Sequence, residues 1–199
     1  MIRRVLRLLL GALILTTGAV ALGAPQANAA TSCFEATLNH PHTGFGYVAA
    51  EVGVGGPYDW DNLLGTLRAR SGTQIGPWEL FEVCRVTDVY GFRLYDTIRS
   101  KRNSMYVTAE LDYTGSMYGL VRARAGGVGT WQQFHFERLP DPCGCAFVIK
   151  LPRNGKYLEV REGTGGLLEK ALFATRSAPT GETSKIACRP TDPARRNCF

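Results

Sequence analysis

The feature that most constrains this chain is a pattern that recurs three times between about residues 33 and 188. In each copy a tyrosine opens a segment that alternates apolar and polar residues, and a short segment centred on alanine follows. The tyrosines are Tyr47, Tyr106 and Tyr157, spaced 59 and 51 residues apart, and the alanines are Ala69, Ala123 and Ala174. A period of this length predicts that one supersecondary unit is built three times.

Each copy also contains two further apolar segments. The closing segments carry Trp78 and Phe81, Trp131 and Phe134, and Thr183 and Ile186. The segments upstream of the tyrosines are residues 34–38, 92–98 and 146–149. Glycine and asparagine separate the segments, as hairpin turns require, and Asn154-Gly155 is the strongest such signal. Since no segment beyond residue 29 has a helical period, we expect twelve short strands.

Three copies of a four-strand unit predict an all-β chain with the β-trefoil fold. Six strands would close a barrel and six would cap it as hairpins, and closure removes the unpaired edges that twelve short strands would otherwise expose. We expect the domain to span residues 30–188, with repeats at about 33–84, 90–138 and 144–188. The repeated positions should point inward as threefold core layers: Tyr47, Tyr106, Tyr157, Trp78, Trp131, Phe81, Phe134 and Ile186.

The N-terminus has the order of a secretory signal peptide. Three arginines precede an apolar run from Leu8 to Leu22, and Ala27-Asn28-Ala29 provides a small-residue cleavage site. A retained membrane anchor is the alternative, but the run is shorter than the ~20 residues that span a bilayer. We therefore expect residues 1–29 to be removed, and the remaining protein to be secreted to the extracellular space. Arg3-Arg4 leaves open whether export is by the general or the twin-arginine route.

The charge of the remaining protein argues against a nucleic-acid partner. Three of the 23 Lys and Arg residues lie in the signal and no acidic residue does, so residues 30–199 have a net charge of +3. No continuous basic stripe appears, as a phosphate-binding surface would need. No second apolar run could span a membrane, so we expect no membrane attachment after signal removal. The 170 residues suit a single domain, which we expect to be a monomer.

Six cysteines follow the predicted cleavage site: Cys33, Cys84, Cys143, Cys145, Cys188 and Cys198. An even number in an exported chain indicates disulfides, and six cysteines allow 15 pairings. Cys143 and Cys145 are too close to bridge each other comfortably, so each should pair with a distant partner. A zinc site is less favoured because its paired cysteines are usually separated by two or more residues. We expect neither a metal nor a cofactor.

Several of these motifs together resemble the fascin-like domain family. They are Asn154-Gly-Lys-Tyr157-Leu158, the Tyr-x-x-Ala-Glu of Tyr106 to Glu110, Leu67-x-Ala69, and Gly76-x-Trp78-Glu79-x-Phe81. The resemblance covers about residues 33 to 188 and implies a β-trefoil related to actin-crosslinking proteins. A single exported domain is similar to the bacterial members, which often accompany carbohydrate-active modules. Actin or filament binding follows only by family analogy, because bundling needs at least two binding surfaces.

The chain departs from that family in its six cysteines and in a polar tail at residues 189–199. Cys198 is expected to tie this tail to the domain. Because the first and last strands of a trefoil are neighbours, Cys33 is expected to pair with Cys188 or Cys198.

A candidate ligand site lies in the first hairpin. From the repeat tyrosine to the next strand, this hairpin has 20 residues, against 15 in each other copy. The insert contains Tyr58, Asp59, Trp60, Asp61 and Asn62. Flat rings that cover a sugar face, with carboxylate and amide groups for its hydroxyls, are the inventory of a carbohydrate site. The alternative is a loop whose tryptophan packs back on the domain.

Enzymatic activity is not predicted. The sequence lacks a Gly-x-Ser-x-Gly elbow and a His-Glu-x-x-His motif. His40 and His42 flank a proline without an evident third metal ligand, and His135 should face outward. The repeat-equivalent Glu51 and Glu110 should lie in different lobes, too far apart for a glycosidase pair. Two hypotheses remain: a module that binds an extracellular carbohydrate, and a trefoil that binds an extracellular protein as an inhibitor or adaptor.

Overall fold

In a computed structural model, the described residues are 29–40, 46–52, 63–72, 74–140, 146–180, 182–195 and 198–199. They form twelve β-strands and three short 3-10 turns, and this described part contains no α-helix and no helix able to cross a membrane. The all-β prediction is confirmed. Residues 1–28, the insert residues 58–62, and Cys143 and Cys145 lie outside the described residues.

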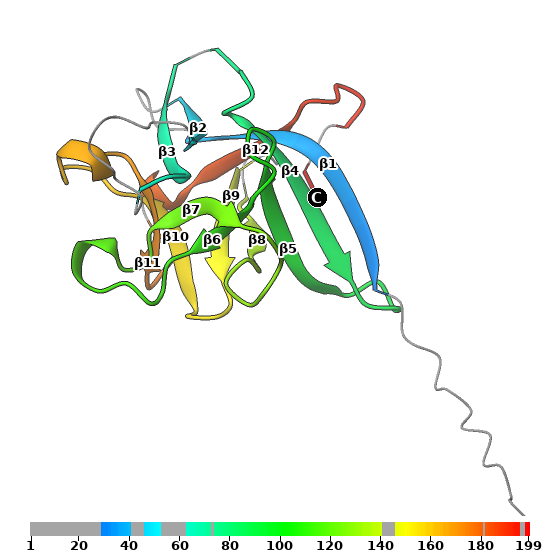
Figure 1. The fold of residues 1–199 in the computed structure, drawn as a ribbon. Helices are drawn as coiled ribbons and strands as arrows, with labels where there is room; N and C mark the ends of the chain where they lie inside the picture. Colours follow the sequence, from blue (N-terminus) through cyan, green and yellow to red (C-terminus); the bar gives the residue numbers. More distant parts are fainter. Residues whose placement is uncertain are drawn as a thin grey trace, which may run out of the picture.

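The strands come in three sets of four (Figure 1). The first set is β1 (Ala30–Asn39), β2 (Tyr47–Glu51), β3 (Thr66–Ser71) and β4 (Leu80–Thr87). The second set is β5 (Arg93–Ser100), β6 (Tyr106–Ala109), β7 (Val121–Ala125) and β8 (His135–Arg138). The third set is β9 (Ala146–Leu151), β10 (Lys156–Val160), β11 (Leu172–Arg176) and β12 (Ile186–Pro190).

Six of these strands close a barrel. Antiparallel ladders join β4 to β1 and β5, β12 to β1 and β9, and β8 to β9. The remaining seam, between β5 and β8, is a bridge in which Asp96 and Phe134 exchange backbone hydrogen bonds of 2.7 and 2.8 Å. The strand edges within the barrel therefore pair with one another, as predicted.

The other six strands form three hairpins, β2–β3, β6–β7 and β10–β11, that make up a cap. A ring of backbone hydrogen bonds joins them, in which an alanine of each hairpin donates to a carbonyl of another. The bonds run from Ala69 to Lys170 (3.0 Å), from Ala123 to Gly65 (2.7 Å) and from Ala174 to Gly119 (2.7 Å). All three accepting residues have positive φ, so the pseudo-threefold repeat extends to backbone conformation.

The core differs from the prediction at the tyrosines and tryptophans. Phe81, Phe134 and Ile186 are fully buried. The tyrosines (47, 106 and 157) and the tryptophans (78 and 131) are only partly buried and lie outside the core cluster. The physical reason is strand alternation: the residue after each tyrosine, Val48, Val107 or Leu158, points inward, so the tyrosine faces the other side of the strand.

Three strands of the barrel extend beyond it. β1 has ten residues and β4 and β5 have eight each, whereas the other barrel strands have four to six. Figure 1 shows these three strands side by side as a ribbon that projects from the body. We call this projection the arm. It consists of the parts of β1, β4 and β5 that extend beyond the barrel, and of the turn at residues 88–92.

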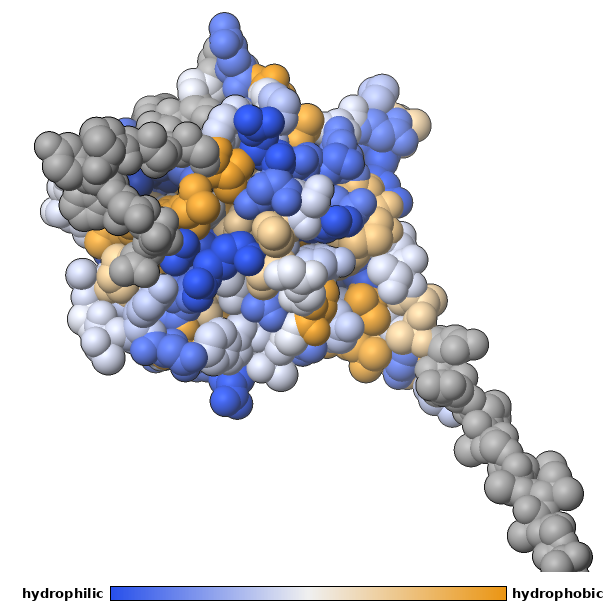
Figure 2. All heavy atoms as spheres, viewed as in Figure 1, coloured by the Kyte–Doolittle hydropathy of each residue, from blue (hydrophilic) through white to orange (hydrophobic). Residues whose placement is uncertain are grey.

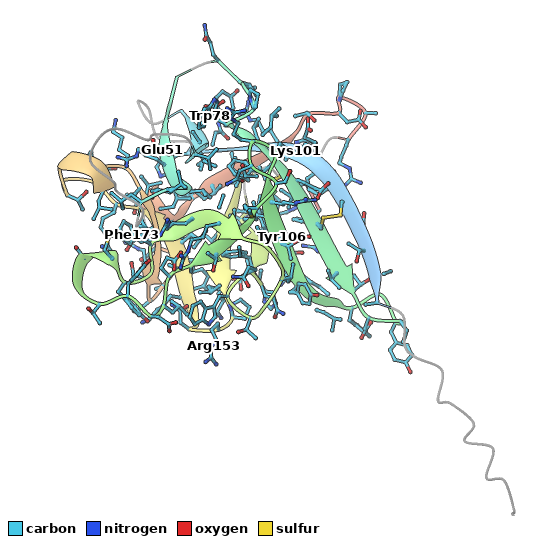
Figure 3. The ribbon with its side chains drawn as sticks, in the orientation of Figure 1. Glu51, Trp78, Lys101, Tyr106, Arg153 and Phe173 are labelled. Carbon is cyan, nitrogen blue, oxygen red and sulfur yellow. A yellow bond between two sulfur atoms is a disulfide. The ribbon has the colours of Figure 1, made fainter. Side chains whose placement is uncertain are left out.

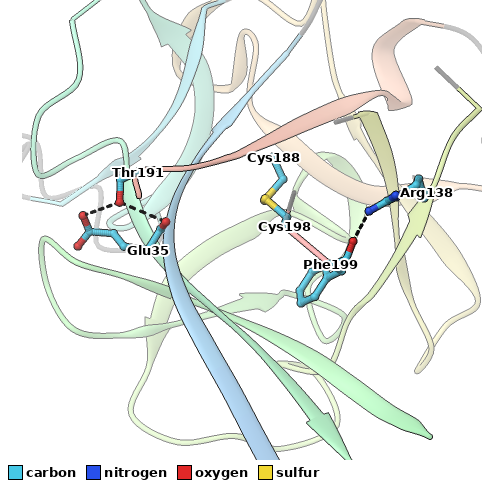
Figure 4. The surroundings of a disulfide bond; sticks show 6 residues. All are labelled: Glu35, Arg138, Cys188, Thr191, Cys198 and Phe199. Carbon is cyan, nitrogen blue, oxygen red and sulfur yellow. Dashed lines mark hydrogen bonds between the residues drawn. A yellow bond between two sulfur atoms is a disulfide. The ribbon is translucent and has the colours of Figure 1, made fainter. Parts of the chain in front are cut away.

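Two disulfides lie within the described residues. Cys188 pairs with Cys198, which ties the tail to β12 (Figure 4). Cys33 pairs with Cys84, so the predicted bridge from Cys33 to Cys188 or Cys198 is wrong. β12 does neighbour β1, but it pairs only with Ala36–Asn39, whereas Cys33 lies farther out, directly opposite Cys84 on β4.

The end of the tail covers the barrel at the end away from the cap hairpins. The Phe199 ring packs edge-on against Phe34 and Phe136, at 5.3 Å between centroids in both cases. The Arg85 guanidinium lies 3.7 Å above the same ring, and Arg138 donates a hydrogen bond to the Phe199 carbonyl (Figure 4). Cys198 and Phe199, at the end of the tail, therefore pack against the domain.

A candidate binding groove between two cap hairpins

A groove of about 610 Å³ opens where the first cap hairpin meets the second repeat. We call it the cap groove. Its lining residues come from both sides of the lengthened first hairpin and from the β5–β6 turn and β7: Val52, Leu64, Asn103, Met105, Arg122, Ala123 and Arg124. The predicted site residues 58–62 lie outside the described residues, but the chain segments that lead into and out of them, at Val52 and Leu64, both line this groove.

Four of the seven residues that line the groove are apolar. Val52 and Ala123 are buried, whereas Leu64 and Met105 leave 48% and 38% of their surfaces exposed. Asn103 fixes one wall, because its amide donates to the Ala123 carbonyl at 2.8 Å and its side-chain oxygen accepts from the Met105 N–H at 3.1 Å. The exposed Met105 side chain is thus presented by a backbone that is already ordered.

The stem of the first hairpin is clamped to the second repeat beside the groove. Arg122 donates from Nε and Nη2 to the Leu64 carbonyl, at 2.8 and 2.6 Å. The next residue, Gly65, has φ +82°, and a Cβ at this position would lie 2.6 Å from the Ala123 carbonyl oxygen. Only glycine fits there without a shift of the backbone. The clamp gives the longer hairpin a fixed base.

A buried carboxylate orients the cationic rim of the groove. Glu110 is 2% exposed and accepts from Nε and Nη2 of Arg124, whose side chain remains 47% exposed. This hydrogen bonding raises the pKa of Arg124, whereas desolvation by burial lowers the pKa of Arg122, which lies 4.0 Å from the same carboxylate. Two guanidinium groups around one carboxylate leave this trio with a net positive charge, and Arg124 carries it to the surface.

The corresponding positions of the other lobes carry related but different pairs. In the first lobe Glu51 (Figure 3) lies 3.1 Å from Arg68. In the third lobe an arginine replaces the glutamate and a phenylalanine replaces the arginine, with the Arg161 guanidinium 3.7 Å above the Phe173 ring. The exposed arginine of the cap groove, Arg124, corresponds to Thr175 in that lobe, so the repeats have diverged at this rim.

Several groups that the sequence analysis considered for catalysis or metal binding lie within the described residues. This described part of the chain contains no group of three or more residues able to hold a metal ion, although His42 lies outside it. Glu51 and Glu110 are each held by an arginine of their own lobe. His135 is partly buried rather than fully exposed, and its Nε2 lies 3.2 Å from the Leu94 carbonyl.

Sequence reasoning placed Ala123 in the repeat but did not assign the flanking Arg122 and Arg124 to a candidate site. It also missed Asn103 and Met105. The recurrence of asparagine at residues 103 and 154, each bonded to the carbonyl of the repeat alanine, was the available signal for an ordered turn. Nothing in the sequence indicated that this turn would face the stem of a different hairpin.

No family model matches the chain, and no curated protein matches its sequence. Solved structures do match. A designed threefold-symmetric protein, ThreeFoil, is 14% identical over 78% of this chain and 97% of its own, with a TM-score of 0.52. The BEL β-trefoil is 14% identical over 79% and 93%, with a TM-score of 0.53. The fold is a β-trefoil.

A natural protein of similar size also matches the trefoil over most of its length. It is a salivary protein from Culex quiquefasciatus of the Cysteine and Tryptophan-Rich family, 11% identical over 83% of this chain and 99% of its own, with a TM-score of 0.50. At such identities these likenesses establish the fold alone.

Proposed function

We propose that this protein is an exported, non-catalytic binding domain that recognises an extracellular carbohydrate at the cap groove. The observation that carries the proposal is the position of the groove, which opens at the clamped stem of the one lengthened hairpin. In this proposal Tyr58, Asp59, Trp60, Asp61 and Asn62 of the insert supply further contacts to the carbohydrate.

The chemistry of the lining supports a ligand with both apolar and hydroxyl-bearing faces. Leu64 and Met105 offer apolar surface to the C–H face of a sugar ring. Arg124 supplies an oriented donor, since Glu110 holds its guanidinium in place. A cavity of this size, mostly apolar with a few placed polar groups, has the general form of a small-ligand site.

Export is part of the same proposal. The signal-like N-terminus supports it, and so do the two disulfides, since such bonds persist in oxidising compartments. Within the β-trefoils we propose membership of the fascin-like domains, on the recurring motifs around Tyr47, Tyr106 and Tyr157. The single-domain, exported form of that family is the one this chain resembles, and we propose that it acts as a monomer.

The proposal is tested by retention on insoluble polysaccharides and on a glycan array. We expect Trp60→Ala and Arg124→Ala each to weaken retention at least tenfold, because each removes one face of the site. Arg153→Ala is the matched control, since it removes an exposed arginine from the β9–β10 turn. Equal retention of all three variants, with unchanged circular dichroism, would contradict the proposal.

A protein partner is the second candidate. The exposed Leu64 and Met105 side chains favour it, because apolar side chains around a fixed arginine also form the centres of protein interfaces. Protease-inhibition assays on the sample used for the glycan array separate the two candidates. Inhibition that Arg124→Ala abolishes, without binding to any glycan, would favour the protein partner.

A further inference from the structure

The turn at the end of the arm, together with the start of β5, exposes four apolar side chains within six residues. Tyr90 is 81% exposed and Phe92 71%, and Val89 and Leu94 are 53% and 47% exposed. In Figure 2 hydrophobic side chains gather at this end of the molecule. Tyr90 and Phe92 are the two most exposed large hydrophobic residues in the described part of the chain.

The turn is held in one conformation. The Asp88 carboxylate accepts hydrogen bonds from the N–H groups of Tyr90 and Phe92, both at 2.9 Å. The backbone closes the same turn, with Asp88 N–H donating to the Phe92 carbonyl at 2.9 Å, and Gly91 takes the left-handed conformation at φ +83°. Presenting the two rings therefore costs little conformational entropy on binding.

The arm also places this turn beside the start of the folded chain. β1 begins at Ala30, which pairs with Thr87, the residue before Asp88. The apolar run that ends at Leu22 is only eight residues before Ala30, so its end lies within about 28 Å of Ala30 even when the connection is fully extended. While that run is embedded in a bilayer, the turn is held close to the membrane surface.

We propose that residues 89–94 contact the membrane interface while the N-terminal segment is still attached. Tyrosine and phenylalanine rings on a projecting turn suit the interfacial region of a bilayer. The turn exposes aliphatic as well as aromatic side chains, and the interfacial region of a bilayer takes up both kinds. The nearby Arg85 and Arg93 are paired with Asp96, and the Asp88 carboxylate accepts backbone N–H groups within the turn, so these charged groups keep their partners at the interface.

The test uses the full chain with its N-terminal segment, reconstituted into vesicles of phosphatidylcholine and phosphatidylglycerol. Tyr90→Trp adds an indole at the turn. The fluorescence emission of the parent protein, which comes from its own tryptophans, is subtracted as background. We expect brominated acyl chains to reduce the added emission at least twofold. Tyr118→Trp is the control, because Tyr118 is a partly exposed tyrosine of the cap and should not be quenched.

Quenching that is equal at positions 90 and 118 would overturn the proposal. A second measurement covers the case in which the added indole perturbs the turn: Phe92→Trp should be quenched like Tyr90→Trp. If neither indole is quenched but Tyr90→Ser abolishes retention on cellulose or chitin, the turn binds glycans instead, and the proposal is wrong.

Discussion

Two glycines at equivalent positions of the first and second lobes allow each lobe to approach the next closely. Gly65 and Gly119 both have positive φ, and a Cβ would lie 2.6 Å from the Ala123 carbonyl oxygen at the first and 2.7 Å from Thr175 Cγ2 at the second. We expect Gly65→Ala to lower the free energy of unfolding by about 2–4 kcal/mol, from left-handed backbone strain and steric displacement together.

Urea unfolding measures this effect. Gly126→Ala is the control, since no atom lies within 4 Å of its added Cβ and its φ is not positive. That change should stay within about 0.5 kcal/mol of the parent protein. If Gly65→Ala were as stable as Gly126→Ala, the clamp at the base of the first hairpin would not exist as described.

Residue-level reasoning from the sequence succeeded where alternation was short and regular. It predicted the strand that begins at Tyr106, but it assigned the tyrosine side chain itself to the core. The error arises because a large aromatic ring and a smaller aliphatic residue next to it are both plausible inward-facing residues. The structure buries Val107 and leaves Tyr106 partly exposed, beside the Arg99 guanidinium, which lies 5.6 Å from its ring.

At the scale of elements, the two disulfides constrain loops of very different length. Cys33–Cys84 spans 51 residues and Cys188–Cys198 spans 10. The loop-entropy argument gives about 4 kcal/mol for the longer loop and about 3 kcal/mol for the shorter. We expect the Cys33→Ala, Cys84→Ala variant to lose more stability than the Cys188→Ala, Cys198→Ala variant.

Chemical denaturation of the two double variants, with the other disulfide intact, gives this comparison. The reverse order would show that packing of the tail against the barrel, rather than loop length, controls the stability that each bridge adds. The contacts of the Phe199 ring give a physical reason for the reverse order, because loss of the Cys188–Cys198 bridge also loosens Phe199.

The partner of Cys33 could not be derived from the repeat alone. In a trefoil the first strand has two barrel neighbours, and both β4 and β12 carry a cysteine. The choice depends on how far β1 extends past β12, and therefore on the length of the arm. Strand ends are set by turns and packing rather than by the apolar pattern of the strand, so the sequence left this point open.

The whole molecule combines a framework that the repeat predicts with a groove that the repeat does not predict. Twelve strands and barrel closure follow from the repeat, because only closure satisfies so many short edges. The cap groove depends on residues 52, 64 and 103–124 meeting across a lobe boundary, and the chain carries no local sign of that meeting. The insert was a visible departure from the repeat, and its stem lines the groove that we propose as the binding site.

The most direct measurement of the central claim is an NMR titration of the 15N-labelled protein with the carbohydrate that it retains best on the array. We expect the amide resonances of Asn103, Met105 and Arg124 to shift together and to saturate with one dissociation constant. Shifts confined to the arm or to the barrel end near Phe199, or no shift with any carbohydrate on the array, would contradict the assignment of the cap groove as the binding site.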